Sequence, residues 1–170
     1  MTRLPAPGTP LTCRQLQIVG GIARGRSNGQ IGAALGLSAD GVRAHVSRIL
    51  RATGECCRAG IVDHAYRTGL LKGLPPEPRP PVTLTLRRRQ VLASMAAGLT
   101  NAQIGRQLGI AEETVRTAAH RLFAQLGATD RAHAVALGWQ HGLLDAGTPA
   151  CASPAPQRAL GAPQGAQEGT

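Results

Sequence analysis

Apolar residues along this chain recur every three or four positions, the spacing that places them on one face of an α-helix. Between residues 11 and 71 the pattern predicts four short helices, at about 13–24, 28–35, 39–52 and 57–67. A second set of four is predicted between residues 84 and 144. No stretch alternates apolar and polar residues as a half-buried strand does. The sequence therefore predicts an all-α fold.

The second set of helices is a repeat of the first. When the chain is shifted by 73 residues, Leu11–Leu71 aligns with Leu84–Leu144 without a gap, and 22 of the 61 aligned pairs are identical. An ungapped match of this length indicates an internal duplication. We therefore expect two tandem four-helix domains, at residues 11–71 and 84–144.

The segments outside the repeats differ in composition. Residues 72–83 contain five prolines, which exclude a helix and favour an extended, semi-rigid linker. Residues 145–170 have almost no large apolar side chains, so we expect a disordered C-terminal tail. Residues 1–10 form a short N-terminal extension, and we expect no separate sensor domain before the first repeat.

Each repeat contains the pattern of a helix-turn-helix. Ser27 and Gln30 have the spacing of a capping box, and an equivalent Thr and Gln recur 73 residues later. The helix that they start ends at Gly36, which suits a left-handed C-terminal residue. Two short helices joined by a tight turn with Gly form a helix-turn-helix, whose second helix enters the major groove of DNA.

The third helix of each repeat has an apolar inner face and a basic, polar outer face. The inner faces carry Val42, Val46, Ile49 and Leu50 in the first repeat, and Val115, Ala119, Leu122 and Phe123 in the second. The outer faces carry Arg43, Ala44, Ser47, Arg48 and Arg51 in the first repeat, and Arg116, Thr117, His120, Arg121 and Ala124 in the second. Arginine can bond two acceptors of guanine, and Ala or the Thr methyl can contact a thymine methyl. These faces are therefore predicted to contact DNA.

The excess of basic residues lies almost entirely in the two repeats. The chain has 19 Lys+Arg against 9 Asp+Glu, a formal charge of +10, of which residues 11–71 hold +5 and residues 84–144 hold +4. A basic surface attracts nucleic acid. The chain has one Trp, one Tyr and one Phe, too few to stack many single-stranded bases, so double-stranded DNA is the expected partner.

No motif indicates an enzyme, a metal centre or a membrane protein. The five histidines are scattered and no Cys-x-x-Cys pair occurs, so we expect no catalytic residue, no cofactor and no metal. No apolar run approaches the ~20 residues of a membrane span, and we expect a cytoplasmic, nucleoid-associated protein. Two interpretations of adjacent Cys56 and Cys57 stay open: ordinary reduced thiols, or a redox switch.

Both repeats resemble the LuxR/GerE-type helix-turn-helix domain. The first shows Leu11-Thr12-Cys13-Arg14, Ser27-Asn28-Gly29-Gln30-Ile31-Gly32, Val42-Arg43-Ala44-His45 and Arg58-Ala59-Gly60-Ile61-Val62. The second shows Leu84-Thr85-Leu86-Arg87, Thr100-Asn101-Ala102-Gln103-Ile104-Gly105, Thr114-Val115-Arg116 and Arg131-Ala132-His133-Ala134-Val135. The first repeat has Gly41 where the family has Thr, and the second has Ala118 where the family has His. We therefore expect the two repeats to differ in DNA affinity.

The resemblance implies which side chains meet DNA. Base contacts are implied for Arg43, Ala44 and Ser47 in the first repeat, and for Arg116, Thr117 and His120 in the second. Phosphate contacts are implied at the start of the second helix, at Asn28 and Asn101, where free backbone amides also favour an anion. Further phosphate contacts are expected from His45, Arg48, Arg51 and Arg121.

These patterns together predict a sequence-specific, DNA-binding transcription regulator with two recognition helices. The alternative is an interaction module that docks on RNA polymerase or on a sigma or anti-sigma partner. Because both domains are in one chain, we expect a monomer that forms an internal pseudo-dimer and reads an asymmetric two-part site. Tyr66 and Trp139 occupy equivalent positions in the two fourth helices. They either meet across the pseudo-dimer contact or pack each on its own domain.

Overall fold

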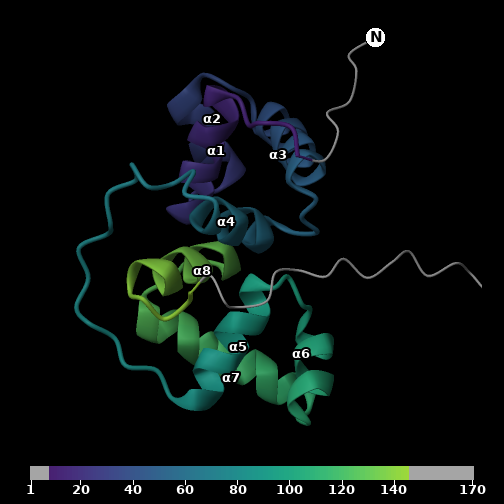
Figure 1. The fold of residues 1–170 in the computed structure, drawn as a ribbon, viewed down its shortest axis with the longest axis vertical. Helices are drawn as coiled ribbons and strands as arrows, with labels where there is room; N and C mark the ends of the chain where they lie inside the picture. Colours follow the sequence, from purple (N-terminus) through teal and green to yellow (C-terminus); the bar gives the residue numbers. More distant parts are fainter. Residues whose placement is uncertain (1–7, 146–170) are drawn as a thin grey trace, which may run out of the picture.

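The computed structural model describes residues 8–145 (Figure 1). Every regular secondary-structure element within that range is an α-helix. The first set comprises α1 (Cys13–Ala23), α2 (Asn28–Leu35), α3 (Ala39–Thr53) and α4 (Arg58–Arg67). The second set comprises α5 (Leu86–Ala96), α6 (Asn101–Leu108), α7 (Glu112–Leu126) and α8 (Arg131–Gln140). Each helix of the second set begins and ends 73 residues after its counterpart. The all-α prediction is confirmed, whereas the predicted disordered tail lies outside the described residues except for Asp145.

The residues that open both repeats have local structural roles. Thr12 caps α1 and forms a capping box with the third residue of the helix. Arg14 donates to the carbonyl of Leu35 at 3.2 Å, so it satisfies a carbonyl in the last turn of α2. In the second set Thr85 caps α5 without a capping box, and Arg87 donates to the carbonyl of Leu108 at the end of α6. The Leu-Thr-x-Arg motif therefore starts the first helix and holds the end of the second.

The turn between α2 and α3 is tight because one glycine lies in the turn and another lies in α2 where the turn passes close to it. Ser27 and Gln30 form the predicted capping box at the start of α2. The helix ends at Gly36, which has a left-handed φ of 66° that favours glycine. A Cβ at Gly32 would lie only 2.4 Å from the carbonyl oxygen of Leu37. The capping box, the left-handed glycine and the close approach all recur between α6 and α7.

The two sets share one apolar core. Ile18 and Val62 of the first set, and Leu92 and Leu137 of the second, are fully buried members of the same cluster. Helix α4 packs against α8, and α1 and α5 each contact the fourth helix of the other set (Figure 1). These matched contacts relate the sets by an approximate two-fold axis. We call the α4–α8 contact the seam.

Two aromatic rings stack across the seam. The ring centroids of Tyr66 and Trp139 lie 5.9 Å apart with 4° between the ring planes. The residue after each aromatic contacts the aromatic of the other set: the Arg67 guanidinium lies 5.8 Å from the Trp139 ring centroid, and the Gln140 amide donates to the Tyr66 hydroxyl at 3.0 Å. The interpretation in which the two rings meet is therefore confirmed, and separate packing on each set is wrong.

The seam also contains a buried carboxylate that has no counterpart in the second set. The Trp139 indole N–H donates to Asp63 Oδ1 at 2.9 Å, and Arg67 Nε donates to Asp63 Oδ2 at 2.6 Å. Asp63 is 3 % exposed and aligns with Ala136 of α8. A buried charge needs such partners, since an unpaired one is costly. The approximate two-fold symmetry therefore fails at this point.

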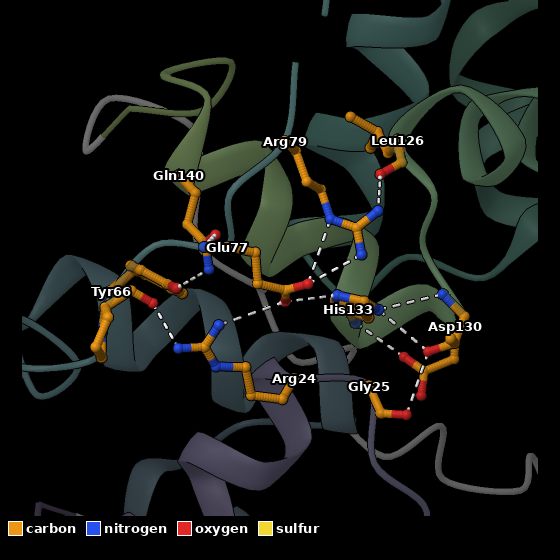
Figure 2. A network of polar contacts seen from close by, with 11 residues as sticks. Arg24, Gly25, Tyr66, Glu77, Arg79, Leu126, Asp130, His133 and Gln140 are labelled. Atoms are coloured by element: carbon orange, nitrogen blue, oxygen red, sulfur yellow. Dashed lines mark hydrogen bonds and ion pairs between the residues drawn. The ribbon is translucent and has the colours of Figure 1, made fainter. Parts of the chain in front are cut away.

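Glu77, in the linker, is the centre of a polar network (Figure 2). Its carboxylate is 2.9 Å from Arg79 and 2.9 Å from His133 Nε2, and Arg24 lies 3.9 Å away. The Gln140 side chain accepts from the Glu77 backbone N–H at 2.9 Å. Burial raises the pKa of the Glu77 carboxyl, but hydrogen bonds from Arg79 and His133 outweigh this, and the net pKa is lowered. Glu77 thus joins the end of α1, the linker and α8.

The proline-rich linker, predicted to be extended and semi-rigid, also makes contacts with both sets. It contains no helix, as predicted. However, Arg24 donates to the carbonyl of Pro75 at 2.5 Å, and Arg79 donates to the carbonyl of Leu126 at 3.0 Å. Proline lacks the N–H donor but keeps its carbonyl, so donors from neighbouring elements can still hold such a segment. The packed seam, rather than the stiffness of the linker, therefore fixes the separation of the two sets.

Candidate nucleic-acid interface

The outer face of α3 is open to solvent. Ser38 caps the helix by accepting from the Gly41 N–H at 3.0 Å. Val42 and Ile49 are fully buried, so they fix the rotation of the helix about its axis. The opposite side presents a set of exposed side chains, as predicted: Arg43, Ala44, Ser47, Arg48 and Arg51.

Helix α7 presents the equivalent face of the second set. Val115 and Leu122 are fully buried on its inner side. Ala111 occupies the N-cap position without a side-chain hydrogen bond, so this helix has the weaker cap that the sequence predicted. The exposed residues again match the prediction: Arg116, Thr117, His120, Arg121 and Ala124.

Each predicted guanine-reading arginine is paired with an acid one turn before it. Arg43 hydrogen-bonds Asp40, and Arg116 hydrogen-bonds Glu113, the residue equivalent to Asp40. Arg116 also lies 3.7 Å from Glu112. All five side chains are more than half exposed, so these pairs are weak and can exchange for other partners. In the structure each guanidinium lies against the acid one turn before it, on the exposed side of its helix.

The two helices differ in charge. Helix α3 has three arginines and one acid, a balance of +2. Helix α7 has two arginines and two acids, a balance of zero. A polyanion is therefore attracted more strongly to α3 than to α7 at long range. This difference agrees with the expectation that the two repeats are not equivalent.

The predicted phosphate contacts divide into exposed and enclosed groups. Arg48, Arg51 and Arg121 are exposed. Asn28 is half-buried, and its side-chain oxygen accepts from Arg58 at 2.6 Å. His45 is also half-buried, and its Nδ1 is enclosed with no hydrogen-bond partner among the described residues. Asn28 and His45 thus have less free polar surface than the phosphate assignment assumed.

Three predicted site residues of the second set lie around one hollow. Asn101, Arg116 and His120 line a space of about 310 Å³ together with Phe123 and Arg131. Asn101 begins α6, whereas Arg116 and His120 lie one turn apart on α7. The hollow therefore joins the predicted phosphate contact at α6 to the predicted base contacts of α7.

Arg58 and Arg131 were not predicted as site residues, although both are in the motif that carries the resemblance. Arg58 donates to Asn28 and to the carbonyl of Arg26 at 2.7 Å, so it fixes the start of α2. Arg131 donates to the carbonyl of Leu99, at the equivalent place before α6. Burial lowers the pKa of both guanidinium groups. The recurrence of the two arginines at the start of the fourth helices was the available signal.

The described part of the chain contains no group of three or more His, Cys, Asp or Glu arranged to hold a metal ion. None of the helices between residues 8 and 145 is long and apolar enough to cross a membrane.

Comparisons with known proteins agree with this geometry. The sequence profile of the GerE family, described as bacterial regulatory proteins of the luxR family, matches residues 9–53 and 82–137. The probable transcriptional regulatory protein NarL of Mycobacterium tuberculosis is 36% identical over 118 residues, which are 68% of this chain and 53% of the relative. The probable transcriptional regulatory protein SgaR of Hyphomicrobium methylovorum is 46% identical over 55 residues, 32% of this chain and 26% of the relative. No solved structure matches significantly.

The matches cover only part of each relative. The chain spans about half the length of the NarL relative and about a quarter of the SgaR relative. The family profile, in contrast, covers more than half of this chain, and its two segments contain α1–α3 and α5–α7 with most of α8. The chain therefore belongs to the LuxR family of bacterial regulatory proteins, which are DNA-binding transcription regulators of the helix-turn-helix type.

Proposed function

We propose that this chain is a sequence-specific, double-stranded DNA-binding transcription regulator built from two tandem helix-turn-helix domains, residues 11–71 and 84–144. In this proposal α3 and α7 each enter the major groove. One observation carries it: the same exposed, arginine-bearing face recurs on α3 and on α7, each behind a capped helix and a tight glycine turn. Membership of a DNA-binding family supports the proposal.

The proposed base contacts are the exposed residues near the start of each recognition helix. Arg43 and Arg116 are suited to bond two acceptors of guanine. Their acidic neighbours hold the guanidinium groups in place until DNA offers a better partner. The neighbouring base-reading residues are Ala44 and Ser47 on α3, and Thr117 and His120 on α7.

The seam takes the role that a dimer contact has in other helix-turn-helix proteins. One recognition helix reads few bases, so such proteins commonly present two helices to half-sites one helical turn apart. Here α4 and α8 pack directly and the aromatic pair lies between them. We infer that one chain reads one two-part site as a monomer. Because the reading positions differ between α3 and α7, the two half-sites differ in sequence.

The experiment begins by selecting bound duplexes from a random pool with the purified chain. The affinity of a selected duplex is then measured over a range of salt concentrations. The logarithm of the affinity should fall with that of the salt concentration by about 0.9 per phosphate contact. A flat response, or no enrichment of any sequence, contradicts DNA reading and favours docking on polymerase or a sigma partner.

Alanine variants separate base contacts from phosphate contacts. Arg43→Ala or Arg116→Ala should cost roughly 1–3 kcal/mol and relax the base preference at one half-site. Arg48→Ala should weaken binding to all sequences alike. Arg89→Ala, at an exposed position on α5, is the matched control and should bind as the wild type does. Circular dichroism must show that each variant is folded.

A further inference from the structure

Two adjacent thiols lie at the seam where the second set has oxygen-bearing side chains. Cys56 and Cys57 precede α4, and their counterparts before α8 are Thr129 and Asp130. Asp130 caps α8 by accepting from a backbone N–H at 2.8 Å, and Cys57 Sγ takes the same position on α4 at 3.4 Å. Aspartate is a preferred N-cap and cysteine is not. Helix capping therefore does not explain the cysteine.

The same exchange of sulfur for oxygen occurs in a contact between the sets. Thr129 Oγ1 donates to the carbonyl of Gly25 in the first set at 3.2 Å. At the equivalent place, Cys56 Sγ lies 3.9 Å from the carbonyl of Gly98 in the second set. A thiol is a weaker donor than a hydroxyl. At both positions the first set therefore has a weaker polar contact and a sulfur atom in place of oxygen.

The two sulfurs are placed to act together. Cys56 and Cys57 are consecutive in the chain, so a single small reagent can reach both sulfurs. Cys56 is exposed, so reagents reach the pair from solvent. Cys57 lines a cavity of about 320 Å³ between the sets, with Leu99 and Arg131 among the other lining residues. The cavity offers room for a group attached to the Cys57 sulfur.

We propose that Cys56 and Cys57 form a two-thiol site that binds a soft, thiophilic centre, and that filling the site weakens DNA binding by loosening the seam. Thiolate sulfur is the side-chain ligand that soft centres prefer. A trivalent organoarsenical is suited to the pair because it takes two sulfurs and keeps one organic group. The binding half of the proposal is independent of the proposed function, whereas the regulatory half rests on it.

The reaction needs no oxidant. A monosubstituted arsenical in water carries two hydroxyl groups on arsenic. Two S–H bonds and two As–O bonds break, two S–As bonds form, and two water molecules leave with the thiol protons. Arsenic stays trivalent and neither sulfur is oxidised.

Filling the site disturbs contacts on both sides of the seam. Bonding to arsenic draws Cys57 Sγ from the Gly60 N–H that it caps, and Cys56 Sγ from the carbonyl of Gly98. Arg131 lines both the seam cavity and the hollow beside α7 that contains Arg116. A group in the cavity therefore moves a residue that forms part of the wall beside the reading face.

Reagents that take one thiol behave differently. Burial raises the pKa of the Cys57 thiol, and reagents that need a standing thiolate react slowly with such a group. A two-thiol reagent bonds first to exposed Cys56 and then finds Cys57 at high effective concentration. Maleimide should therefore label Cys56 faster than Cys57, whereas an arsenical should occupy both.

The test uses the full chain with Cys13→Ser and Cys151→Ser, which leaves only the seam pair of the four cysteines. Phenylarsine oxide is the probe, and intact mass reports the number of phenylarsenic groups bound. We expect one group per chain, released by a small dithiol. The variant Cys56→Thr with Cys57→Asp carries the residues of the second set. It should remain folded and bind DNA, but capture no arsenic.

The effect on DNA binding is measured on the same preparations. Loading should lower the affinity of the two-thiol chain for its selected duplex by roughly tenfold or more, the loss expected if one of two linked contacts is released. The Thr/Asp variant should keep its affinity in the presence of the reagent. No capture by the two-thiol chain, or equal capture by the Thr/Asp variant, overturns the site. Capture with unchanged DNA affinity overturns the regulation, whereas absence of DNA binding before loading overturns the proposed function alone.

Discussion

Replacement of Glu77 by alanine removes the centre of the network that ties the linker to both sets. The lost contacts are the hydrogen bonds with Arg79 and His133, at 2.9 Å each, and the longer ion pair with Arg24 at 3.9 Å. The Glu77 side chain is 17% exposed and that of His133 is 3% exposed, so water replaces these partners poorly. We therefore expect a loss of stability larger than that of a surface ion pair.

The expected loss of stability is the sum of the contributions of the Glu77 contacts. A hydrogen bond to a charged group contributes roughly 1.5–3 kcal/mol. Three such bonds are lost, two from the Arg79 guanidinium and one with His133, but the two from one guanidinium do not add in full, and the cost of burying the Glu77 carboxylate disappears with them. The Arg24 pair, at its longer distance, adds little. We expect the free energy of unfolding to fall by about 2–4 kcal/mol for Glu77→Ala and by about half as much for Glu77→Gln, which keeps an acceptor.

Urea denaturation at neutral pH measures this loss, and Lys72→Ala, an exposed change in the same linker, is the control. The control should change stability by less than about 0.5 kcal/mol. Because the pKa of Glu77 is lowered, its contribution is present above the ordinary value of 4.5 and lost as the pH falls below it. The difference between wild type and Glu77→Ala should therefore shrink in acid. Equal stability of Glu77→Ala and Lys72→Ala at neutral pH would refute the reasoning.

Three other substitutions test the seam and the helix turn. Trp139→Phe keeps the ring stack but removes the indole bond to buried Asp63, so unfolding should cost ~1–3 kcal/mol less. The pKa of Glu55 is raised to about 7, first by burial and then by Asp63. The folded chain binds the Glu55 proton more tightly than the unfolded chain does. This contribution to the free energy of unfolding is fully present below pH 4.5 and is lost as the pH rises through about 7. Glu55→Gln should therefore stabilise the chain above pH 7 in thermal unfolding, with no gain below pH 4.5. Gly32→Ala places a Cβ 2.4 Å from a backbone oxygen and should cost ~1–3 kcal/mol or more. A Cβ at Gly29 would meet only Ser27 Oγ, at an ordinary contact distance of 3.8 Å, so Gly29→Ala should be neutral or slightly stabilising.

Much of the fold follows from patterns within a few residues of each other. The capping box at Ser27, the left-handed Gly36 and the inward side of α3 at Val42 and Ile49 are all local signals, and all three were predicted correctly. The 73-residue repeat then extended each prediction to the second set. The equivalent positions of Tyr66 and Trp139 left two interpretations open, and the structure decides for the one in which the rings meet.

The contacts that the sequence did not predict join distant parts of the chain. Glu77 lies 56 residues from His133, and no local pattern pairs a linker acid with a buried histidine on α8. The linker was interpreted from its prolines alone. Prolines predict that no helix forms, but they do not predict which side chains donate hydrogen bonds to the backbone carbonyls. The pair of Arg43 with Asp40, in contrast, has the ordinary i, i+3 spacing of a helix. The same spacing of an acid and an arginine recurs at Glu113 and Arg116, so both pairs could have been predicted from the sequence.

The central claim is that one chain places two different recognition helices on one DNA site. Protection of guanine N7 from methylation on a selected duplex tests it directly, because Arg43 and Arg116 are proposed to bond guanine in the major groove. With one chain bound per duplex, we predict two protected patches about one helical turn apart. Arg43→Ala should expose one patch and Arg116→Ala the other. A single patch, the same patch lost in both variants, or two chains on one minimal site would contradict the claim.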